Sequence, residues 1–116
     1  MAGPLVEVAV SDHCVVARVR GEMDYTTRPA LQERFVELIT RGYRFIVLDM
    51  SGVTFCDSAG LNVLVVARLR ADERGAELVL ACVPPNLVRV LWMTGVDQVL
   101  RVFATVAEAE AAAPRT

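Results

Sequence analysis

The sequence contains no lysine, and all 12 of its basic residues are arginine. A chain without lysine cannot form a Schiff base, use a side-chain amine as a nucleophile, or build the lysine-containing loop of P-loop nucleotide-binding proteins. Several classes of enzyme are therefore excluded by composition alone.

Cysteine and long apolar stretches are also scarce. The three cysteines, at positions 14, 56 and 82, are odd in number and have no CxxC spacing, so the sequence indicates neither a disulfide framework nor a metal site. No apolar run reaches the roughly 18 residues of a membrane span, and the N-terminus lacks the basic and apolar regions of a secretory signal. We therefore expect a cytoplasmic protein that does not contact a membrane.

The remaining composition is that of a globular domain. The chain has 116 residues, of which 54% are hydrophobic and 22% charged, so we expect residues 1–116 to form one domain around a single core. The net charge of −2 offers no broad positive field to a phosphate backbone, which argues against direct binding of nucleic acid.

Strand and helix patterns alternate along the chain and predict an α/β fold. Thr26 or Thr27 is placed to cap the first helix. The expected elements are a hairpin over residues 6–20, helix 28–41, strand 45–48, loop 50–57, helix 58–74, strand 78–83, a short helix that ends at Gly95, strand 99–103 and helix 105–112. This order predicts a mostly parallel mixed sheet of about five strands with an antiparallel N-terminal strand, about four helices, and a flexible tail from about residue 112.

Ser58 lies where the expected loop 50–57 enters the second helix, at the carboxyl end of a central strand. Open α/β sheets place their functional sites at this edge. In one interpretation, Asp57 or Ser58 only caps the helix, which stabilises it by about 1 kcal/mol. In the other, Ser58 accepts a phosphate, whose charge is favoured by the polarised amide groups of a helix N-terminus.

The first half of the second helix is apolar on nearly all sides. Ser58, Asn62, Val65 or Val66, and Leu69 follow one another along one line at helical spacing. Either neighbouring parts of the domain bury this line, or it is an exposed apolar strip that binds a protein partner. The sequence leaves both interpretations open.

Two motifs carry a resemblance to a known family. They read Gly21-Glu22-Met23-Asp24 and Val53-Thr54-Phe55-Cys56-Asp57-Ser58-Ala59-Gly60-Leu61, and the likeness continues through residues 75–83 and 90–96. With these motifs the chain resembles the STAS domain of bacterial anti-sigma-factor antagonists over nearly its whole length. The resemblance implies a STAS-like fold and a role in transcription regulation and the stress response.

In that family, the serine of the second motif is phosphorylated by a partner kinase that is itself the anti-sigma factor. By resemblance the phosphoacceptor here is Ser58, and the acidic residues of the two motifs are Asp57 and Asp24. The unphosphorylated form would bind the anti-sigma factor serine kinase and free the sigma factor. Phosphorylation would release the kinase, and a phosphoserine phosphatase would reset the switch, so that the chain itself is no enzyme and needs no cofactor.

The partner-binding residues that the resemblance implies flank Ser58 and extend the first motif. They are Asp24, Tyr25, Thr26, Thr27, Asp57, Ala59, Gly60, Asn62 and Val65. Ala59 stands where many members carry a second hydroxyl residue, which removes an ambiguity about the acceptor. The loop 24–27 departs from the common pattern, so the resemblance does not indicate which anti-sigma factor binds there.

Two alternatives to this function fit the residues less well. Residues 56–60 partly resemble the nucleophile elbow of serine hydrolases, but the first glycine is absent, and the single histidine, His13, precedes the serine instead of following it. Residues 46–50 resemble the phosphoacceptor strand of a two-component receiver domain, but receivers use a lysine that this chain lacks. Asp49 is instead expected to end its strand and to accept hydrogen bonds from loop amides.

Overall fold

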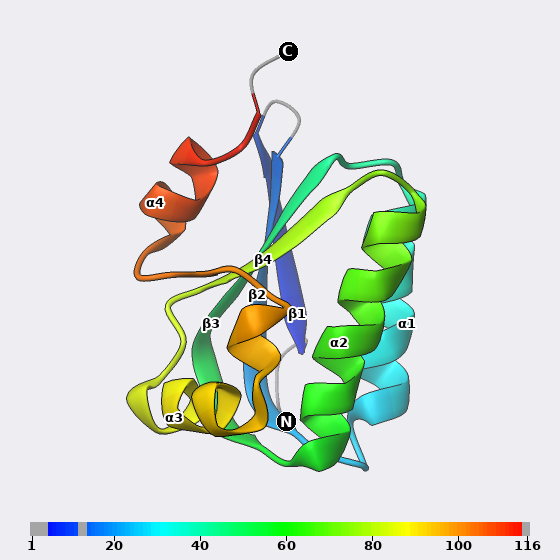
Figure 1. Cartoon of the computed structure of the whole chain (residues 1–116). Helices are drawn as coiled ribbons and strands as arrows, with labels where there is room; N and C mark the ends of the chain where they lie inside the picture. Colours follow the sequence, from blue (N-terminus) through cyan, green and yellow to red (C-terminus); the bar gives the residue numbers. More distant parts are fainter. Residues whose placement is uncertain (1–4, 12–13, 115–116) are drawn as a thin grey trace.

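The computed structural model describes residues 5–11 and 14–114, which form a mixed sheet with helices on both faces (Figure 1). In chain order the elements are β1 (Val6–Ser11), β2 (Cys14–Met23), α1 (Arg28–Thr40), β3 (Phe45–Cys56), α2 (Ser58–Glu73), β4 (Glu77–Ala81), α3 (Pro85–Thr94), the 3-10 helix η1 (Val96–Gln98), β5 (Val102–Phe103) and α4 (Val106–Ala111).

The strands follow one another across the sheet in the same order as along the chain. β1 pairs with β2 in antiparallel fashion, and each later neighbour is parallel. Parallel neighbours need a crossover connection, and α1, α2 and α3 supply the three that this order requires. The predicted α/β class, with a mostly parallel sheet and an antiparallel first strand, is confirmed.

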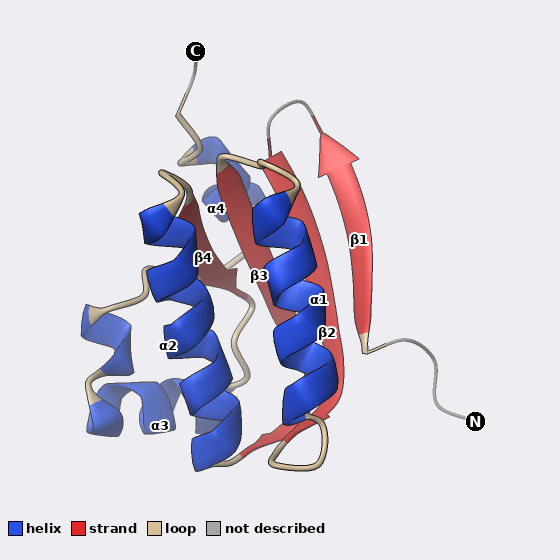
Figure 2. Cartoon of the chain, turned by 90° about the vertical axis from the view of Figure 1, so that its right-hand side faces the viewer, coloured by secondary structure: helices blue, strands red, loops and turns tan. Residues whose placement is uncertain are grey.

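The core lies on both sides of the sheet. α1 and α2 run side by side over one face (Figure 2), where Phe35 and Leu64 pack with Ile46 of β3 in the larger buried cluster. On the opposite face, Ala109 of α4 packs in a smaller cluster that includes Val47. β3 is therefore covered on both faces at its first four residues, which explains why this run is apolar without alternation.

β3 is much longer than the sequence indicates. The expected loop 50–57 is wrong, because the strand continues to Cys56 and keeps Met50 and Val53 buried. These two residues are three apart and would face opposite sides of a regular strand, but the pairing with β2 contains a register shift between them. Gly52 lies at this bulge, where a Cβ atom would be only 2.9 Å from a backbone carbonyl oxygen of β2.

Asp49 is consequently inside β3 and not at its end, which corrects the sequence-based expectation. Its carboxylate still accepts a hydrogen bond from a following amide, the N–H of Ser51, at 3.0 Å. The acceptor role is as expected, and only the strand boundary differs.

The C-terminal elements also differ in their bounds. β4 ends at Ala81, two residues before the expected end, and Cys82 adopts a left-handed backbone with φ of 55°. The expected strand 99–103 is reduced to its last two residues, because the chain turns at Gly95 into η1 and then buries Leu100. The predicted hairpin pairs as expected, with residues 12–13 of its turn outside the described residues.

Candidate functional site

The first turn of α2 is capped by Asp57 and not by Ser58. The backbone of Asp57 is extended, and its Oδ1 accepts hydrogen bonds from the N–H groups of Ala59 and Gly60 at 2.9 and 3.1 Å. Ser58 is the first helical residue and is exposed. The cap and the hydroxyl are therefore provided by two different residues, which leaves the hydroxyl of Ser58 available for other chemistry.

Gly60 joins this turn to the end of β2. A Cβ atom at Gly60 would clash with the carbonyl oxygen of Met23 and would lie 2.8 Å from Sγ of Cys56. The same carbonyl accepts the N–H of Asp57 at 3.1 Å. Gly60 is buried, so it contributes to the site through packing. Because it has no side chain, α2 can approach β2 closely at this point.

The loop that follows Met23 is held in shape by its own side chains. Oδ1 of Asp24 accepts from the N–H groups of Thr26 and Thr27 at 2.9 and 3.0 Å, and from the hydroxyl of Thr26. The hydroxyl of Thr27 donates to the carbonyl of Glu22 at 2.8 Å. Thr27 occupies the cap position of α1 but makes no side-chain cap, so the expected capping role is wrong for this pair of threonines.

The hydrogen bonds in this loop favour the charged form of Asp24. Its pKa is lowered from the ordinary value, chiefly because the hydroxyl of Thr26 donates to it, with further help from the amides of Thr27 and Thr26. Tyr25, at the tip of the same loop, is 75% exposed. The loop therefore presents a fixed negative charge and a large aromatic ring to solvent.

The line of residues that begins at Ser58 is open to solvent over much of its length. Asn62 and Leu69 are exposed, and Val65 and Val66 are half-buried. Burial of this line by neighbouring elements therefore holds only for its middle, where Val65 packs against the larger buried cluster. The exposed members of the line are Ser58, Asn62 and Leu69, of which Leu69 is apolar and 53% exposed.

The predicted site residues fall into two groups that Met23 holds together. The loop 24–27 follows Met23 directly, and the carbonyl oxygen of Met23 accepts the N–H of Asp57 and lies against Gly60. Asn62 and Val65 lie further along α2 and extend the surface away from the loop. Both motifs of the resemblance thus meet at the carboxyl edge of the sheet.

Phe55 also lies near Ser58 in the chain, although it was not among the predicted site residues. It is 50% exposed, three residues before Ser58 and near the end of β3. It also helps to line a groove of about 220 Å³ between the end of β3 and the first turns of α3, whose lining residues are Val53, Thr54, Phe55, Cys56, Pro84, Asn86, Leu87 and Val90. The sequence signal for a strand here was the run of β-branched and aromatic residues Val53-Thr54-Phe55, which the expected loop 50–57 did not take into account.

A thiol-based or metal-dependent activity has little support near Ser58. Burial, together with the adjacent carboxylate of Asp57, raises the pKa of Cys56 to about 11, which leaves almost no thiolate at neutral pH. Within residues 5–11 and 14–114, no group of three or more His, Cys, Asp and Glu side chains is arranged to hold a metal ion. No helix in the described part of the chain is long and apolar enough to cross a membrane.

Comparison with known proteins places this geometry in one family. A model of the STAS domain matches residues 6–109. The anti-sigma-F factor antagonist RsfB of Mycobacterium tuberculosis is 31% identical over 108 residues, which cover 90% of this chain and 86% of that protein. An anti-sigma-B factor antagonist of Staphylococcus aureus is 27% identical over 97 residues, covering 84% of this chain and 90% of that protein.

A solved structure supports the same assignment. An anti-sigma factor antagonist from Mycobacterium paratuberculosis has a TM-score of 0.84 against this chain at 26% identity, over 92% of this chain and 91% of that one. The fold and the matches thus define a small α/β domain of the STAS type. The chain belongs to the STAS domain family, as the resemblance indicated, and the relatives named here are anti-sigma factor antagonists.

Proposed function

We propose that this chain is an anti-sigma factor antagonist whose binding is switched off by phosphorylation of Ser58. The observation that carries the proposal is the separation of roles at the start of α2. Asp57 caps the helix, and Ser58 is exposed at the start of a partly open line along α2 that continues through Asn62 to Leu69. A kinase can reach such a hydroxyl without unfolding the domain.

The unphosphorylated form binds an anti-sigma factor through the surface around Ser58. Tyr25, in the loop after β2, and Phe55, near the end of β3, are exposed and supply aromatic contact area. Asn62 and Val65 continue the surface along α2. Binding of the anti-sigma factor frees the sigma factor that it would otherwise hold. The anti-sigma factor is also the serine kinase, so the chain is its substrate and carries out no reaction of its own.

Phosphorylation acts through charge at this interface. A phosphate adds about −1.5 to −2 charges. It gains little from the helix N-terminus, because Asp57 already occupies the N–H groups of Ala59 and Gly60. It also adds to the negative charge of the adjacent Asp57, which takes no part in the ion pairs formed among the described residues.

The energetic consequence is large enough for a switch. Burying an unpaired charge at an interface costs several kcal/mol, and each 1.4 kcal/mol is about a tenfold change in affinity. One phosphate on Ser58 therefore weakens the complex by about 100- to 1,000-fold. A phosphoserine phosphatase restores the binding form.

The proposal is tested by incubating the chain with ATP and anti-sigma factor kinases and locating the phosphate by mass spectrometry. Phosphate is expected on Ser58, and Ser58→Ala is expected to abolish incorporation. Ser51→Ala is the matched control, because Ser51 is an exposed serine on β3 and its removal should change nothing. Phosphate found elsewhere, with Ser58 unmodified, contradicts the proposed switch.

Calorimetry tests the second half of the proposal. Ser58→Glu is expected to weaken binding to the anti-sigma factor by at least tenfold, whereas Ser58→Ala should bind as tightly as the parent. Equal affinities for Ser58→Glu and the parent show that charge at this position does not control the complex.

A further inference from the structure

β1 is the edge strand of the sheet, and the hydrogen-bonding groups on its outer side can be assigned from its pairing. The N–H of Arg20 donates to the carbonyl oxygen of Leu5 at 2.8 Å. In an antiparallel ladder, every second residue exchanges hydrogen bonds with the neighbouring strand, and the residues between them direct their N–H and C=O groups away from it. The outward-facing residues of β1 are therefore Val6, Val8 and Val10.

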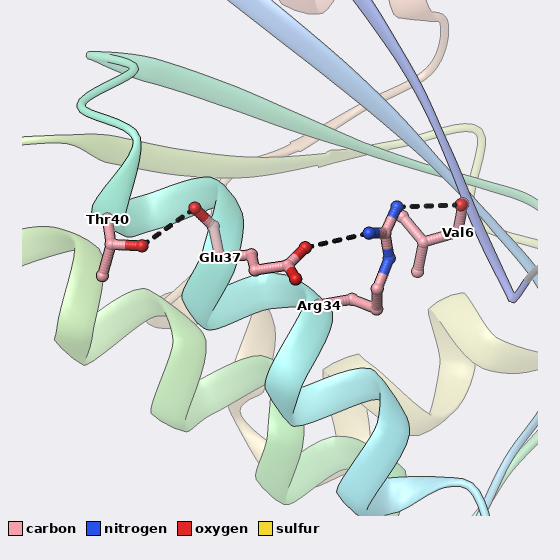
Figure 3. A network of polar contacts seen from close by, with 4 residues as sticks. All are labelled: Val6, Arg34, Glu37 and Thr40. Atoms are coloured by element: carbon pink, nitrogen blue, oxygen red, sulfur yellow. Dashed lines mark hydrogen bonds and ion pairs between the residues drawn. The ribbon is translucent and has the colours of Figure 1, made fainter.

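One of these outward groups is occupied by a side chain of α1. Nη2 of Arg34 donates to the carbonyl oxygen of Val6 at 3.4 Å, while Nη1 pairs with the carboxylate of Glu37 at 2.9 Å (Figure 3). Within the described part of the chain, the outward groups of Val8 and Val10 have no hydrogen-bond partner. Arg34 thus covers one end of the edge and leaves the segment from Val8 to Val10 open.

The open segment lacks the usual protection of an edge strand. Edges are commonly blocked by lysine, proline, bulges or an uncompensated charge, and residues 6–11 contain none of these. Their single charge, on Glu7, is paired with Arg20 at 2.7 Å. The side chains of Val8 and Val10 are 37% and 55% exposed, so the open segment is neutral, apolar and β-branched.

We propose that β1 pairs with β1 of a second copy of this chain, in antiparallel fashion about a two-fold axis at Ala9. In this register Val8 lies opposite Val10 of the second copy, and Val10 lies opposite its Val8. The two pairs form about four backbone hydrogen bonds, and the carbonyl of Val6 stays with Arg34. The contact is isologous and closes at two copies.

The charge pattern of the strand favours a second copy as the occupant. The two-fold axis at Ala9 places Glu7 opposite position 11 and not opposite its own counterpart, so no like charges face each other across the new pair. The half-exposed side chains of Val8 in one copy and Val10 in the other then cover one another, on the face of the sheet that carries α1 and α2. The strand can thus pair with itself in this register without placing like charges opposite each other.

The dimer is weak and leaves the phosphorylation surface free. Two outward-facing residues from each copy give a contact well below the roughly 1,200–2,000 Å² of stable interfaces, so we expect a dissociation constant on the order of 100 μM to 1 mM. α1 lies between β1 and α2 in Figure 2, so self-pairing and partner binding use separate surfaces. This inference goes beyond the proposed function and does not depend on it.

The test combines sedimentation equilibrium with amide NMR on the full chain at concentrations from about 20 μM to 1 mM. The average mass is expected to rise toward that of a dimer, and the amides of Val8 and Val10 are expected to shift and to gain protection from exchange. Val8→Pro removes one outward N–H without taking a bond from the ladder between β1 and β2, so it should abolish the dimer. Val8→Lys keeps the backbone donor, adds an edge charge and should weaken the dimer at least tenfold.

Arg34→Ala provides the opposite test. It uncovers the carbonyl of Val6, which lies beyond the two proposed pairs of Val8 and Val10, so it should not weaken association, whereas both Val8 variants should. Glu37→Ala is the matched control, because it removes the ion pair but leaves Arg34 free to bond to Val6. A parent chain that stays monomeric at about 1 mM overturns the proposal, as does a dimer that survives both Val8 variants with a native circular dichroism spectrum.

Discussion

Gly60 in the first turn of α2 lies directly against the carbonyl oxygen of Met23 at the end of β2, with no room for a side chain between them. The same oxygen accepts the N–H of Asp57. One backbone carbonyl therefore fixes the start of α2 and, through the loop that follows Met23, sets the position of Tyr25 relative to Ser58. The shape of the proposed binding surface depends on this contact.

Gly60→Ala is expected to destabilise the fold by about 1–3 kcal/mol, because the added methyl group must push α2 away from β2. This loss should exceed the gain of up to about 1 kcal/mol that alanine brings to a helix interior. Urea denaturation measures the difference. Asn62→Ala, at an exposed position two residues later, is the control and should stay within about 0.5 kcal/mol of the parent. A fully stable Gly60→Ala variant shows that the contact with Met23 can relax.

Asp57 should reveal its capping role through the contrast between two replacements. Asp57→Ala removes the acceptor for the amides of Ala59 and Gly60 and should cost about 1 kcal/mol of unfolding free energy. Asp57→Asn keeps a side-chain oxygen and should cost less than half of that. Thermal denaturation of the three proteins measures the order. Equal losses for the two variants indicate that the negative charge, and not the hydrogen bonds, is what matters.

Asp24 should make stability depend on pH in a defined direction. Because the folded state lowers its pKa, the stabilisation from the charged form is complete above the unfolded pKa of about 3.9. It is lost as the pH falls below that value and through the folded pKa. The stability difference between the parent and Asp24→Asn should therefore be constant at neutral pH and shrink in acid.

Thr26→Val provides the control for this titration. It removes the hydroxyl that contributes most to the lowered pKa of Asp24, so the pKa should move back up toward the ordinary value. Carboxyl NMR titration measures the pKa directly. If the pKa is the same in both proteins, the hydroxyl of Thr26 does not bond to the carboxylate in solution.

Phe55→Ala should weaken binding of the anti-sigma factor by about tenfold or more, as expected of an aromatic side chain at the centre of an interface. Stability should change little, because half of the ring is already exposed. Calorimetry against the partner measures the affinity. Val102→Ala is a control on β5 and should bind like the parent. Unchanged affinity for Phe55→Ala places the interface away from the end of β3.

The sequence was sufficient to predict the element order, the parallel sheet and the position of Ser58, because hydrophobic periodicity and helix-end signals are local. It failed at β3, where Ser51-Gly52 has the composition of a turn but forms a bulge in a continuing strand. That bulge depends on pairing with β2, which lies more than 25 residues earlier in the chain. The exposure of Phe55 and the choice of Asp57 as the cap depend on the same long-range packing, so periodicity alone could not settle them.

Cys56 should be unusually slow to react with iodoacetamide. Its pKa is raised from 9.0 to about 11, so its thiolate fraction at pH 7.5 is smaller by a factor on the order of 100. Peptide mapping by mass spectrometry should therefore find modification on the order of 100-fold slower than for a free cysteine peptide, and the difference should vanish in guanidinium chloride. Asp57→Asn removes the second cause of the raised pKa and should speed the reaction, while burial continues to slow it. A parent protein that is modified at the rate of the free peptide has an accessible thiolate beside Ser58, and a thiol-based activity then has to be reconsidered.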